Sequence, residues 1–249
     1  MGSNKGYQNE SLIAEALNGK TFSELNHNLQ SMIKDLFGYP DDSTIECAQF
    51  EGPYKPDIYI KYKGETKYVS IKSGRANMVH GENIRDFILF LRSIGVSKQT
   101  QKTLLLFHFG DGTMDGTGEK RMDYINVSTW LEKLIPDANY ELNRDHALID
   151  KFIQRVMFQG IDETAQEAGY IYFGSPEYGQ IVSKRQIFAY SNSRSWQHFN
   201  CLHIGPIFFK PHARYSKGKI KSVVMREKVD CYWPNFAEDL DRIGKRFTF

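Results

Sequence analysis

Residues 56–74 read Pro-Asp-Ile-Tyr-Ile-Lys-Tyr-Lys-Gly-Glu-Thr-Lys-Tyr-Val-Ser-Ile-Lys-Ser-Gly, and this stretch decides the fold. Two short segments alternate apolar and polar residues on either side of residues 63–66, a pattern typical of a β-hairpin. A type II′ turn has glycine at its first central position, so we expect Gly64 to open the turn. That register predicts Asp57 directly opposite Lys72 on the neighbouring strand.

The two faces of this predicted hairpin differ in their chemistry. Side chains alternate between the faces of a strand, so Asp57, Ser70 and Lys72 share one face. The other face gathers the branched apolar side chains of Ile58, Ile60, Val69 and Ile71. The apolar face would attach the hairpin to a core, and the polar face would present an acid beside a lysine. Taken alone, such a pair is also an ordinary cross-strand ion pair, worth under about 1 kcal/mol.

Composition places the chain among ordinary globular proteins. Its 249 residues are 41% hydrophobic and 25% charged, which is enough to build a sizeable core. No run of 18 apolar residues occurs, so no membrane span is expected. The three cysteines lie far apart without Cys-x-x-Cys spacing, and the N-terminus lacks an apolar signal region. Together these features predict reduced thiols in a cytoplasmic protein.

Charge is distributed unevenly although the formal net charge is only +2. Residues 184–249 contain 13 Lys and Arg against 5 Asp and Glu, and residues 1–183 contain 19 against 25. Aromatic residues are interleaved with the basic ones in the later segment. Such a segment can contact the phosphates and bases of a nucleic acid. It is equally consistent with aromatic strand core and lysines on a solvated face.

Apolar residues at helical spacing precede the hairpin twice. The first stretch follows Asn9, which is of an N-cap residue type, and ends at Gly19, and the second runs from about residue 21 to Gly38. Glu10 lies at the edge of the first apolar stripe. It is either a charge that complements the helix dipole or a group that reaches a site beneath the helix.

The segments after the hairpin complete the predicted α/β pattern. A helix begins after His80-Gly81-Glu82 and ends at Gly95. Residues 103–109 (Thr-Leu-Leu-Leu-Phe-His-Phe) are continuously apolar, so we predict a strand buried on both faces. The order of helix, strands, helix and buried strand predicts a mixed sheet. The glycine-rich residues 110–118 are predicted to form a surface loop.

Patterns in the remaining segments are weaker, and a soft domain boundary is placed near residue 125. Further helices are expected near residues 127–134, 142–158 and 236–243, and further strands near residues 44–50, 170–173, 204–209 and 220–225.

The order of parts over residues 5–109 resembles the PD-(D/E)xK nuclease superfamily. An acid-bearing helix is followed by Pro56-Asp57, then by Ser70-Ile71-Lys72, a helix and a buried segment. The opening Lys5-Gly6, with Glu10 a few residues on, is similar to that of the Holliday-junction-resolvase branch. The resemblance implies a restriction-endonuclease-like mixed β-sheet flanked by helices. Residues 1–125 would then be the nuclease core, and residues 126–249 a C-terminal α+β elaboration.

The resemblance also implies a role for each matching residue. Asp57 matches the metal-binding acid, Lys72 the lysine that orients or activates the attacking water, and Glu10 the helix glutamate that completes the metal site. Ser70 departs from the pattern, because the family usually has Asp or Glu there. Some restriction enzymes of the superfamily have serine at this place and carry the acid on the following helix. Glu82 is the candidate for that acid, although it is also read as an N-terminal helix charge.

The implied activity is that of a Mg²⁺-dependent, site-specific endonuclease that hydrolyses phosphodiester bonds of double-stranded DNA, as a type II restriction enzyme does. Two cuts in a symmetric site need two active sites, so a homodimer is expected. The C-terminal half would recognise the target and form the dimer, with base readout by Arg185, Arg194, Arg214 and Arg226.

Three other interpretations remain open at this point. One is a structure-selective enzyme such as a junction resolvase or a repair nuclease. Another is a non-catalytic DNA-binding protein that lost a metal ligand at Ser70. The third is an unrelated α/β protein in which the Asp57–Lys72 pair is structural.

Overall fold

The computed structural model describes residues 5–50, 52, 54–73, 78–193, 195–196, 200–216 and 219–246. For residue 5, residues 213–216 and 219–226, and residues 245–246, it describes the backbone alone. Within this part of the chain, no helix is long and apolar enough to cross a lipid bilayer. Cys47, Cys201 and Cys231 are buried and carry free thiols.

The chain folds into two compact units, and each is discontinuous in sequence. The first unit comprises Met1–Ala76, Met157–Tyr190 and Asn235–Phe249, and the second comprises Asn77–Val156 and Ser191–Pro234. The chain therefore passes from one unit to the other four times. The boundary that we expected near residue 125 falls inside the second unit, so a single cut there does not separate the two units.

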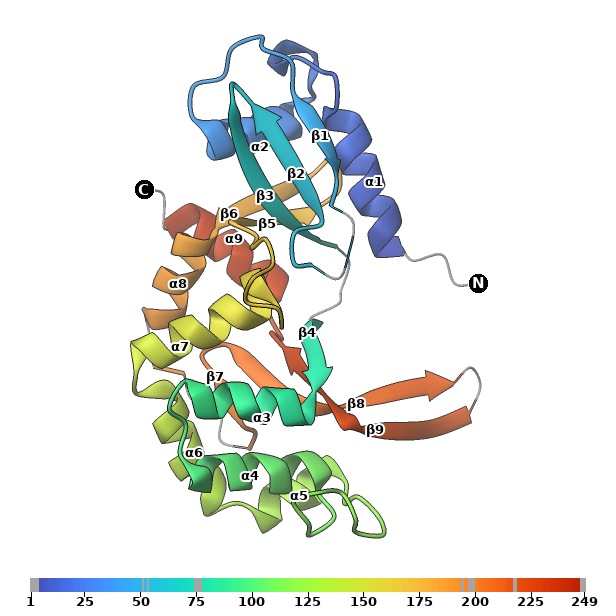
Figure 1. Ribbon diagram of the computed structural model, residues 1–249, viewed down its shortest axis with the longest axis vertical. Coiled ribbons are helices and arrows are strands. Elements are labelled where there is room, and N and C mark those ends of the chain that lie inside the picture. The colour runs from blue at the N-terminus through green and yellow to red at the C-terminus, as the bar shows by residue number, and fades with distance from the viewer. Residues whose placement is uncertain are drawn as a thin grey trace. The chain divides into compact units, whose positions relative to one another are not determined.

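The first unit contains a five-stranded mixed sheet, visible in the upper half of Figure 1. Its strand order is β1-β2-β3-β5-β6, and all neighbours are antiparallel except β3 and β5, which are parallel. This confirms an α/β class with a mixed sheet. The strands are β1 (Glu46–Gln49), β2 (Ile58–Tyr62), β3 (Glu65–Lys72), β5 (Tyr170–Gly174) and β6 (Gly179–Ser183). The helical elements are α1 (Lys5–Leu17), η1 (Phe22–Glu24), α2 (His27–Phe37), α8 (Lys184–Asn192) and α9 (Phe236–Arg246).

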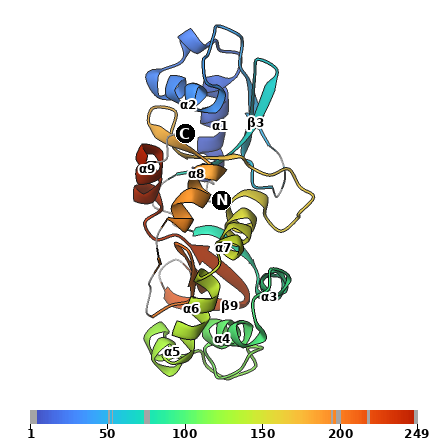
Figure 2. The ribbon, with the colours of Figure 1, turned by 90° about the vertical axis from the view of Figure 1, so that its left-hand side faces the viewer.

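Helices α1 and α2 pack on the apolar face of this sheet (Figure 2). Both helices were predicted, but their first residues differ from our expectation. Helix α1 begins at Lys5, so Asn9 lies inside the helix and does not cap it. Helix α2 begins later than expected, because Asn26 is its N-cap and accepts a hydrogen bond from Leu29 N. The apolar core between the layers includes Ile13, Leu17, Leu29, Ile33, Ile58, Ile60, Val69 and Ile71.

The β2–β3 hairpin has a different turn from the one predicted. Ile58 pairs with Val69, so the turn residues are Lys63 and Gly64, with φ angles of 53° and 80°. Two positive φ angles are the mark of a type I′ turn, whose twist matches that of the flanking strands. The predicted register is therefore wrong by two residues. A shift of two leaves every side chain on its predicted face.

The second unit contains a four-stranded antiparallel sheet in the order β4-β9-β8-β7. Phe87, Phe152 and Phe209 pack edge to face in its core, with ring centroids 5.3–6.2 Å apart. The strands are β4 (Met78–Asn83), β7 (His203–Ile204), β8 (Ile207–Ser216) and β9 (Lys219–Tyr232). The helices are α3 (Ile84–Ser93), α4 (Lys98–Phe109), α5 (Tyr124–Trp130), α6 (Leu134–Asn143) and α7 (His146–Ile153), followed by the π-helical segment η2 (Gln154–Gln159).

Residues 103–109 form the second half of α4, so the predicted buried strand is wrong. Ser97 caps this helix by accepting a hydrogen bond from Thr100 N, and Glu141 of α6 binds the hydroxyls of both residues at 2.6 Å. Most side chains of α4 are buried. A short apolar run has the same appearance in a buried helix as in a buried strand. The polar residues 98–102 before the run belong to the same helix.

Candidate functional site

Asp57 precedes β2 and is held against the end of β3. Its main-chain N–H donates to Val69 O at 2.9 Å, which continues the ladder one residue beyond the strand. Beyond this point the main-chain N–H of Ile71 bonds to a side chain and not to a neighbouring strand, because Asp57 Oδ2 accepts its hydrogen bond at 2.5 Å. Ser70 Oγ donates to the same oxygen at 3.0 Å. The Asp57 carboxylate is therefore held in position by groups at the end of β3.

Lys72 is the last residue of β3, and its ammonium group folds back towards Asp57. Nζ donates to Ser70 Oγ at 2.7 Å and to Ile71 O at 3.1 Å, and it lies 3.5 Å from Asp57 Oδ2. Ser70 is fully buried and connects the acid with the lysine. The side chains of Lys72 and Asp57 are 27% and 21% exposed, so solvent reaches both. The predicted face of Asp57, Ser70 and Lys72 is thus present, although the paired register ends at Ile58 and Val69 and does not include Asp57.

Glu10 of α1 lies in the electrostatic field of this pair. Burial raises the pKa of Glu10, the negative charge of Asp57 raises it further, and the positive charge of Lys72 partly offsets the rise. Asn9 anchors this turn of α1, because its Nδ2 donates to Gly174 O at the end of β5 at 2.8 Å. Since Phe173 pairs with Lys72, β5 and β3 end side by side. The structure therefore brings four of the predicted residues, Glu10, Asp57, Ser70 and Lys72, to one end of the sheet.

Two oxygen groups at this end have no partner in the part of the chain that the structure describes. No hydrogen bond reaches the Glu10 carboxylate or Asp57 Oδ1 from any of those residues. Two carboxylates and one ammonium leave a net charge of about −1. Neighbouring like charges are costly, and a cation placed between them would relieve the cost.

Glu82 lies in the second unit, in a different environment from the one predicted. It belongs to β4, and α3 begins two residues later, after the cap Asn83. Its buried carboxylate receives Arg155 Nη2 at 2.7 Å and Nε at 3.3 Å, and His80 Nε2 lies 3.3 Å away. Burial alone would raise the pKa of Glu82, but the hydrogen bonds from His80 and Arg155 outweigh burial and lower it. Glu82 and Asp57 belong to different units.

The arginines expected to read bases are only partly described. Arg185 is an exposed residue of α8. Arg194 lies outside the described residues, and so do the side chains of Arg214 on β8 and Arg226 on β9. Sequence reasoning missed Arg155 as the partner of Glu82 and Asn9 as the anchor of α1. The sequence holds no local signal for either role, because the partners lie 73 and 165 residues away.

The donor set at the end of the sheet suits magnesium. Within the described residues, no group of three or more His, Cys, Asp and Glu side chains lies so that it could hold a metal ion by itself. Magnesium is commonly bound through one or two carboxylates, with waters and substrate phosphates completing its shell. Asp57 and Glu10 supply such a pair, so the residues present fit this ion.

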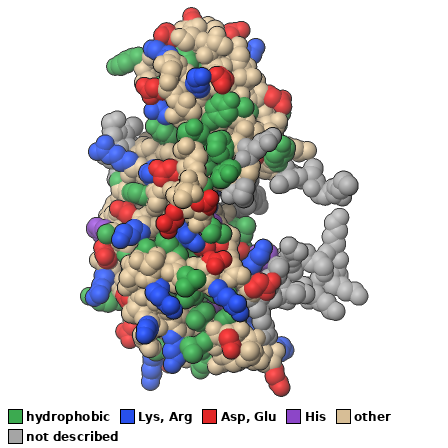
Figure 3. Space-filling model, in the orientation of Figure 1, with side chains coloured by type: hydrophobic (Ala, Val, Ile, Leu, Met, Phe, Trp, Pro, Cys, Tyr) green, Lys and Arg blue, Asp and Glu red, His purple; other side chains and the backbone are tan. Residues whose placement is uncertain are grey.

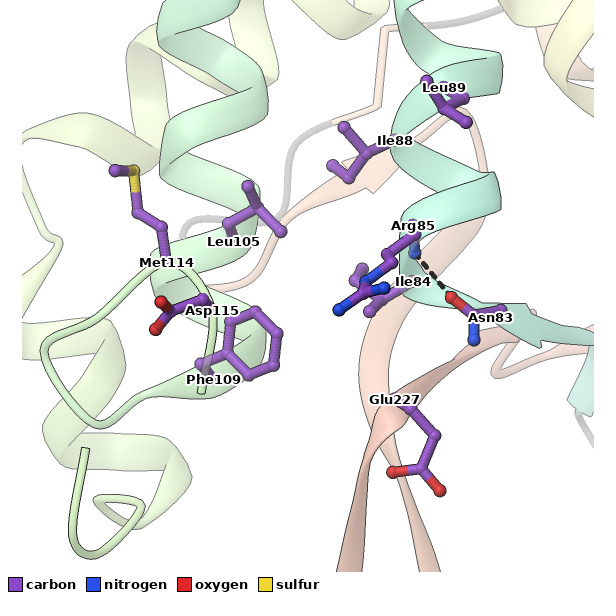
Figure 4. Close-up of a pocket in the computed structure, with 10 residues that line it drawn as sticks. All are labelled: Asn83, Ile84, Arg85, Ile88, Leu89, Leu105, Phe109, Met114, Asp115 and Glu227. Atoms are coloured by element: carbon purple, nitrogen blue, oxygen red, sulfur yellow. Dashed lines mark hydrogen bonds between the residues drawn. The ribbon is translucent and has the colours of Figure 1, made fainter. Parts of the chain in front are cut away.

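A pocket of about 800 Å³ lies elsewhere, in the second unit, between α3, α4 and the loop after α4. Figure 4 shows Leu105, Phe109 and Met114 on one side and Ile84 and Ile88 on the other. The remaining lining residues are Asn83, Arg85, Leu89, Asp115 and Glu227. Among the described residues, the lining is mainly apolar.

Comparison with known proteins adds no assignment. No protein-family model matches the chain, and no curated protein matches it either. The structure defines a mixed α/β protein with an acid–serine–lysine cluster at the end of its first sheet.

Proposed function

We propose that this protein is a magnesium-dependent endonuclease of the PD-(D/E)xK type that cuts double-stranded DNA at specific sites, as a type II restriction enzyme. One observation carries the proposal. The carboxylate of Asp57, the hydroxyl of Ser70 and the ammonium of Lys72 form one hydrogen-bonded cluster, and Glu10 lies in its field. The mixed sheet with helices packed on it agrees with the fold that the family resemblance implies.

The charges of the cluster suit a phosphodiester substrate. Asp57 Oδ1 and the Glu10 carboxylate would hold the magnesium ion. When bound, this ion polarises the scissile phosphate and lowers the pKa of a coordinated water. The two carboxylates, Lys72, a divalent cation and one phosphodiester sum to zero charge. A partly buried site with balanced charges is less costly than one with an uncompensated charge.

Lys72 would orient the attacking water or a phosphate oxygen. Two of its N–H groups are fixed by Ser70 Oγ and Ile71 O. The third faces Asp57 Oδ2 at 3.5 Å, the limit of hydrogen bonding, so a closer anionic oxygen would replace it. Ser70 is not an acid, and its role here is to hold the lysine and the aspartate in one geometry. Two metal-binding carboxylates rather than three are sufficient for this arrangement.

The test is cleavage of plasmid and λ DNA in Mg²⁺ or EDTA by the wild type and by single variants. Discrete fragments that require Mg²⁺ are expected. Asp57→Asn and Lys72→Met should lower the cleavage rate at least about 100-fold, the lower range for a lost acid–base or positioning group. Glu10→Gln should do the same. Its matched control is Glu15→Gln on the same helix, because Glu15 is exposed and should be dispensable.

Each alternative has its own outcome in this experiment. Cleavage confined to branched DNA would replace the restriction enzyme with a junction resolvase or repair nuclease. Binding without cleavage in Mg²⁺ would leave a non-catalytic DNA-binding protein. Wild-type cleavage by Asp57→Asn would reject the site itself. Light scattering during gel filtration should give the mass of a homodimer, as symmetric double-strand cutting requires.

A further inference from the structure

Strands β8 and β9 continue as a two-stranded ribbon beyond the rest of their sheet (Figure 1). Strand β4 pairs only with Lys228–Tyr232 of β9, and β7 pairs only with residues 207 and 208 of β8. Across the remaining described positions, the two strands pair with each other alone. An isolated two-stranded hairpin is at best marginally stable in water. A ribbon of this length therefore suggests a function that depends on its projecting from the sheet.

The ribbon is the basic part of the second unit. By sequence the unit has 18 Lys and Arg against 13 Asp and Glu, a net charge of +5. Residues 207–232 alone have 7 against 2, which equals the whole excess. On the face drawn in Figure 3, by contrast, charged side chains of both signs are interspersed over the described surface. Positive charge is thus concentrated on the ribbon by sequence.

The root of the ribbon contains an ordered polar cluster around Asp230. This aspartate is 2% exposed, and its two oxygens lie 3.0 and 2.9 Å from His212 Nδ1. Tyr232 OH donates to the same carboxylate at 3.3 Å. The register shifts between Pro211 and His212, and such a bulge changes the direction of a side chain. A Cβ at Gly81 would lie 3.1 Å from Asp230 Oδ1, so glycine leaves room for the carboxylate.

This cluster fixes which groups face outward. An ionised carboxylate only accepts hydrogen bonds, so Nδ1 of His212 carries a proton towards Asp230 and Nε2 points away from it. In the imidazolium form Nε2 carries a second proton, which it can donate to a phosphate oxygen. No described residue bonds to Nε2, and the His212 side chain is 25% exposed. Lys210 lies opposite Asp230, and its ammonium sits 3.4 Å from the centre of the Tyr232 ring. Partial burial lowers the pKa of Lys210, and the charge of Asp230 partly offsets this.

We propose that the β8–β9 ribbon is an arm that lies along double-stranded DNA, with Lys210 and His212 at its root contacting a backbone phosphate. This inference rests on the proposed function, because it names how the same protein holds its substrate. The major groove of DNA admits a two-stranded β-ribbon, and phosphate contacts fix the register of a protein on the duplex. The excess positive charge of the ribbon complements the charge of DNA. Asp230 acts as a positioning residue for the imidazole.

The test measures binding of a fluorescent duplex of mixed sequence by anisotropy in EDTA, between 50 and 200 mM salt. The slope of log K against log salt is negative. The double variant Lys210→Ala/His212→Ala should lower the magnitude of this slope by about 1 to 2, since each lost phosphate contact removes about 0.9. Lys210→Gln alone should lower it by about 1. This second variant leaves the His212–Asp230 bond intact, so it reports on binding even if the double variant folds poorly.

The matched control is Lys102→Ala, an exposed lysine on α4 of the same unit, which should leave the slope unchanged. Equal slopes for wild type and Lys210→Gln would overturn the arm, and so would a preference for single-stranded over duplex DNA. If the arm variants cut DNA in Mg²⁺ with wild-type salt dependence, the arm is wrong and the nuclease stands. If the slopes fall as expected but wild type never cleaves DNA, the nuclease is wrong and the arm stands.

Discussion

Removing one partner of the buried ion pair between Glu82 and Arg155 should strongly destabilise the second unit. Both residues are buried, at 3% and 8% exposure, and Arg155 also lies 4.5 Å from the centre of the Phe90 ring. Arg155→Met keeps most of the apolar stem but leaves the Glu82 carboxylate buried without its main partner. Breaking a buried pair in this way costs about 3–5 kcal/mol. For a chain of this size the midpoint of thermal unfolding should fall by about 10 °C.

Urea denaturation followed by circular dichroism would measure this loss. The double variant Glu82→Gln/Arg155→Met should be less destabilised than the two single variants together, by about 1–3 kcal/mol, because a neutral glutamine needs no counter-charge. The control is Lys184→Met. Lys184 binds Glu167 at 2.6 Å, but these side chains are 30% and 39% exposed, so we expect under about 1 kcal/mol. A loss below about 1 kcal/mol for Arg155→Met would refute the reasoning.

The pH dependence of this loss has a defined sign. The pKa of Glu82 is lowered in the folded protein, so its stabilising contribution is present above the ordinary glutamate value of 4.5 and is lost as the pH falls through the folded value. The difference between wild type and Arg155→Met should therefore be largest at neutral pH and shrink in acid. In the cleavage assay, Glu82→Gln distinguishes a structural role of Glu82 from a catalytic one. Loss of activity with retained stability would show that Glu82 acts as a catalytic acid.

Two further predictions concern the first unit. Because the pKa of Glu10 is raised, its ionisation weakens the fold as the pH rises through that pKa. Glu10→Gln should therefore raise the melting temperature at pH 7 but not below pH 4.5, and added Mg²⁺ should stabilise only the wild type. A glutamine variant that is less stable than the wild type at pH 7 would contradict this. Gly64→Ala should cost about 1–2 kcal/mol through its φ of 80° alone, since a Cβ there meets nothing within 4 Å. Gly169→Ala, at a glycine without positive φ, is its control in the same urea titration, and equal losses would count against the turn argument.

The cluster of Asp57, Ser70 and Lys72 could be predicted although the turn was wrong. The predicted and observed registers differ by two residues, and side chains repeat with the same period. The face of each residue was therefore insensitive to that error, whereas a shift of one residue would have separated Asp57 from Ser70 and Lys72. The two N-terminal helices were predictable for a similar reason, because each depends on a local apolar stripe that meets the sheet.

Environments that depend on distant partners could not be predicted from the sequence. Residues 103–109 became a helix because Glu141 binds the N-terminal residues of α4 and the surrounding core buries the rest. Glu82 was placed by a supposed helix start, but its environment is set by Arg155, 73 residues later. Neither partner is marked by spacing or composition. The division into two discontinuous units was hidden for the same reason.

The interrupted first unit has a consequence for how the protein is made. Strand β3 ends at Lys72, and its parallel neighbour β5 begins only at Tyr170, so the ribosome must synthesise most of the second unit before the first sheet can close. Helix α9 comes later still, and its Phe236, Leu240 and Ile243 are almost fully buried. A premature stop after residue 234 would keep every proposed catalytic residue yet remove part of the core that supports them. The cluster formed within residues 10–72 would then depend on a helix that begins only at Phe236.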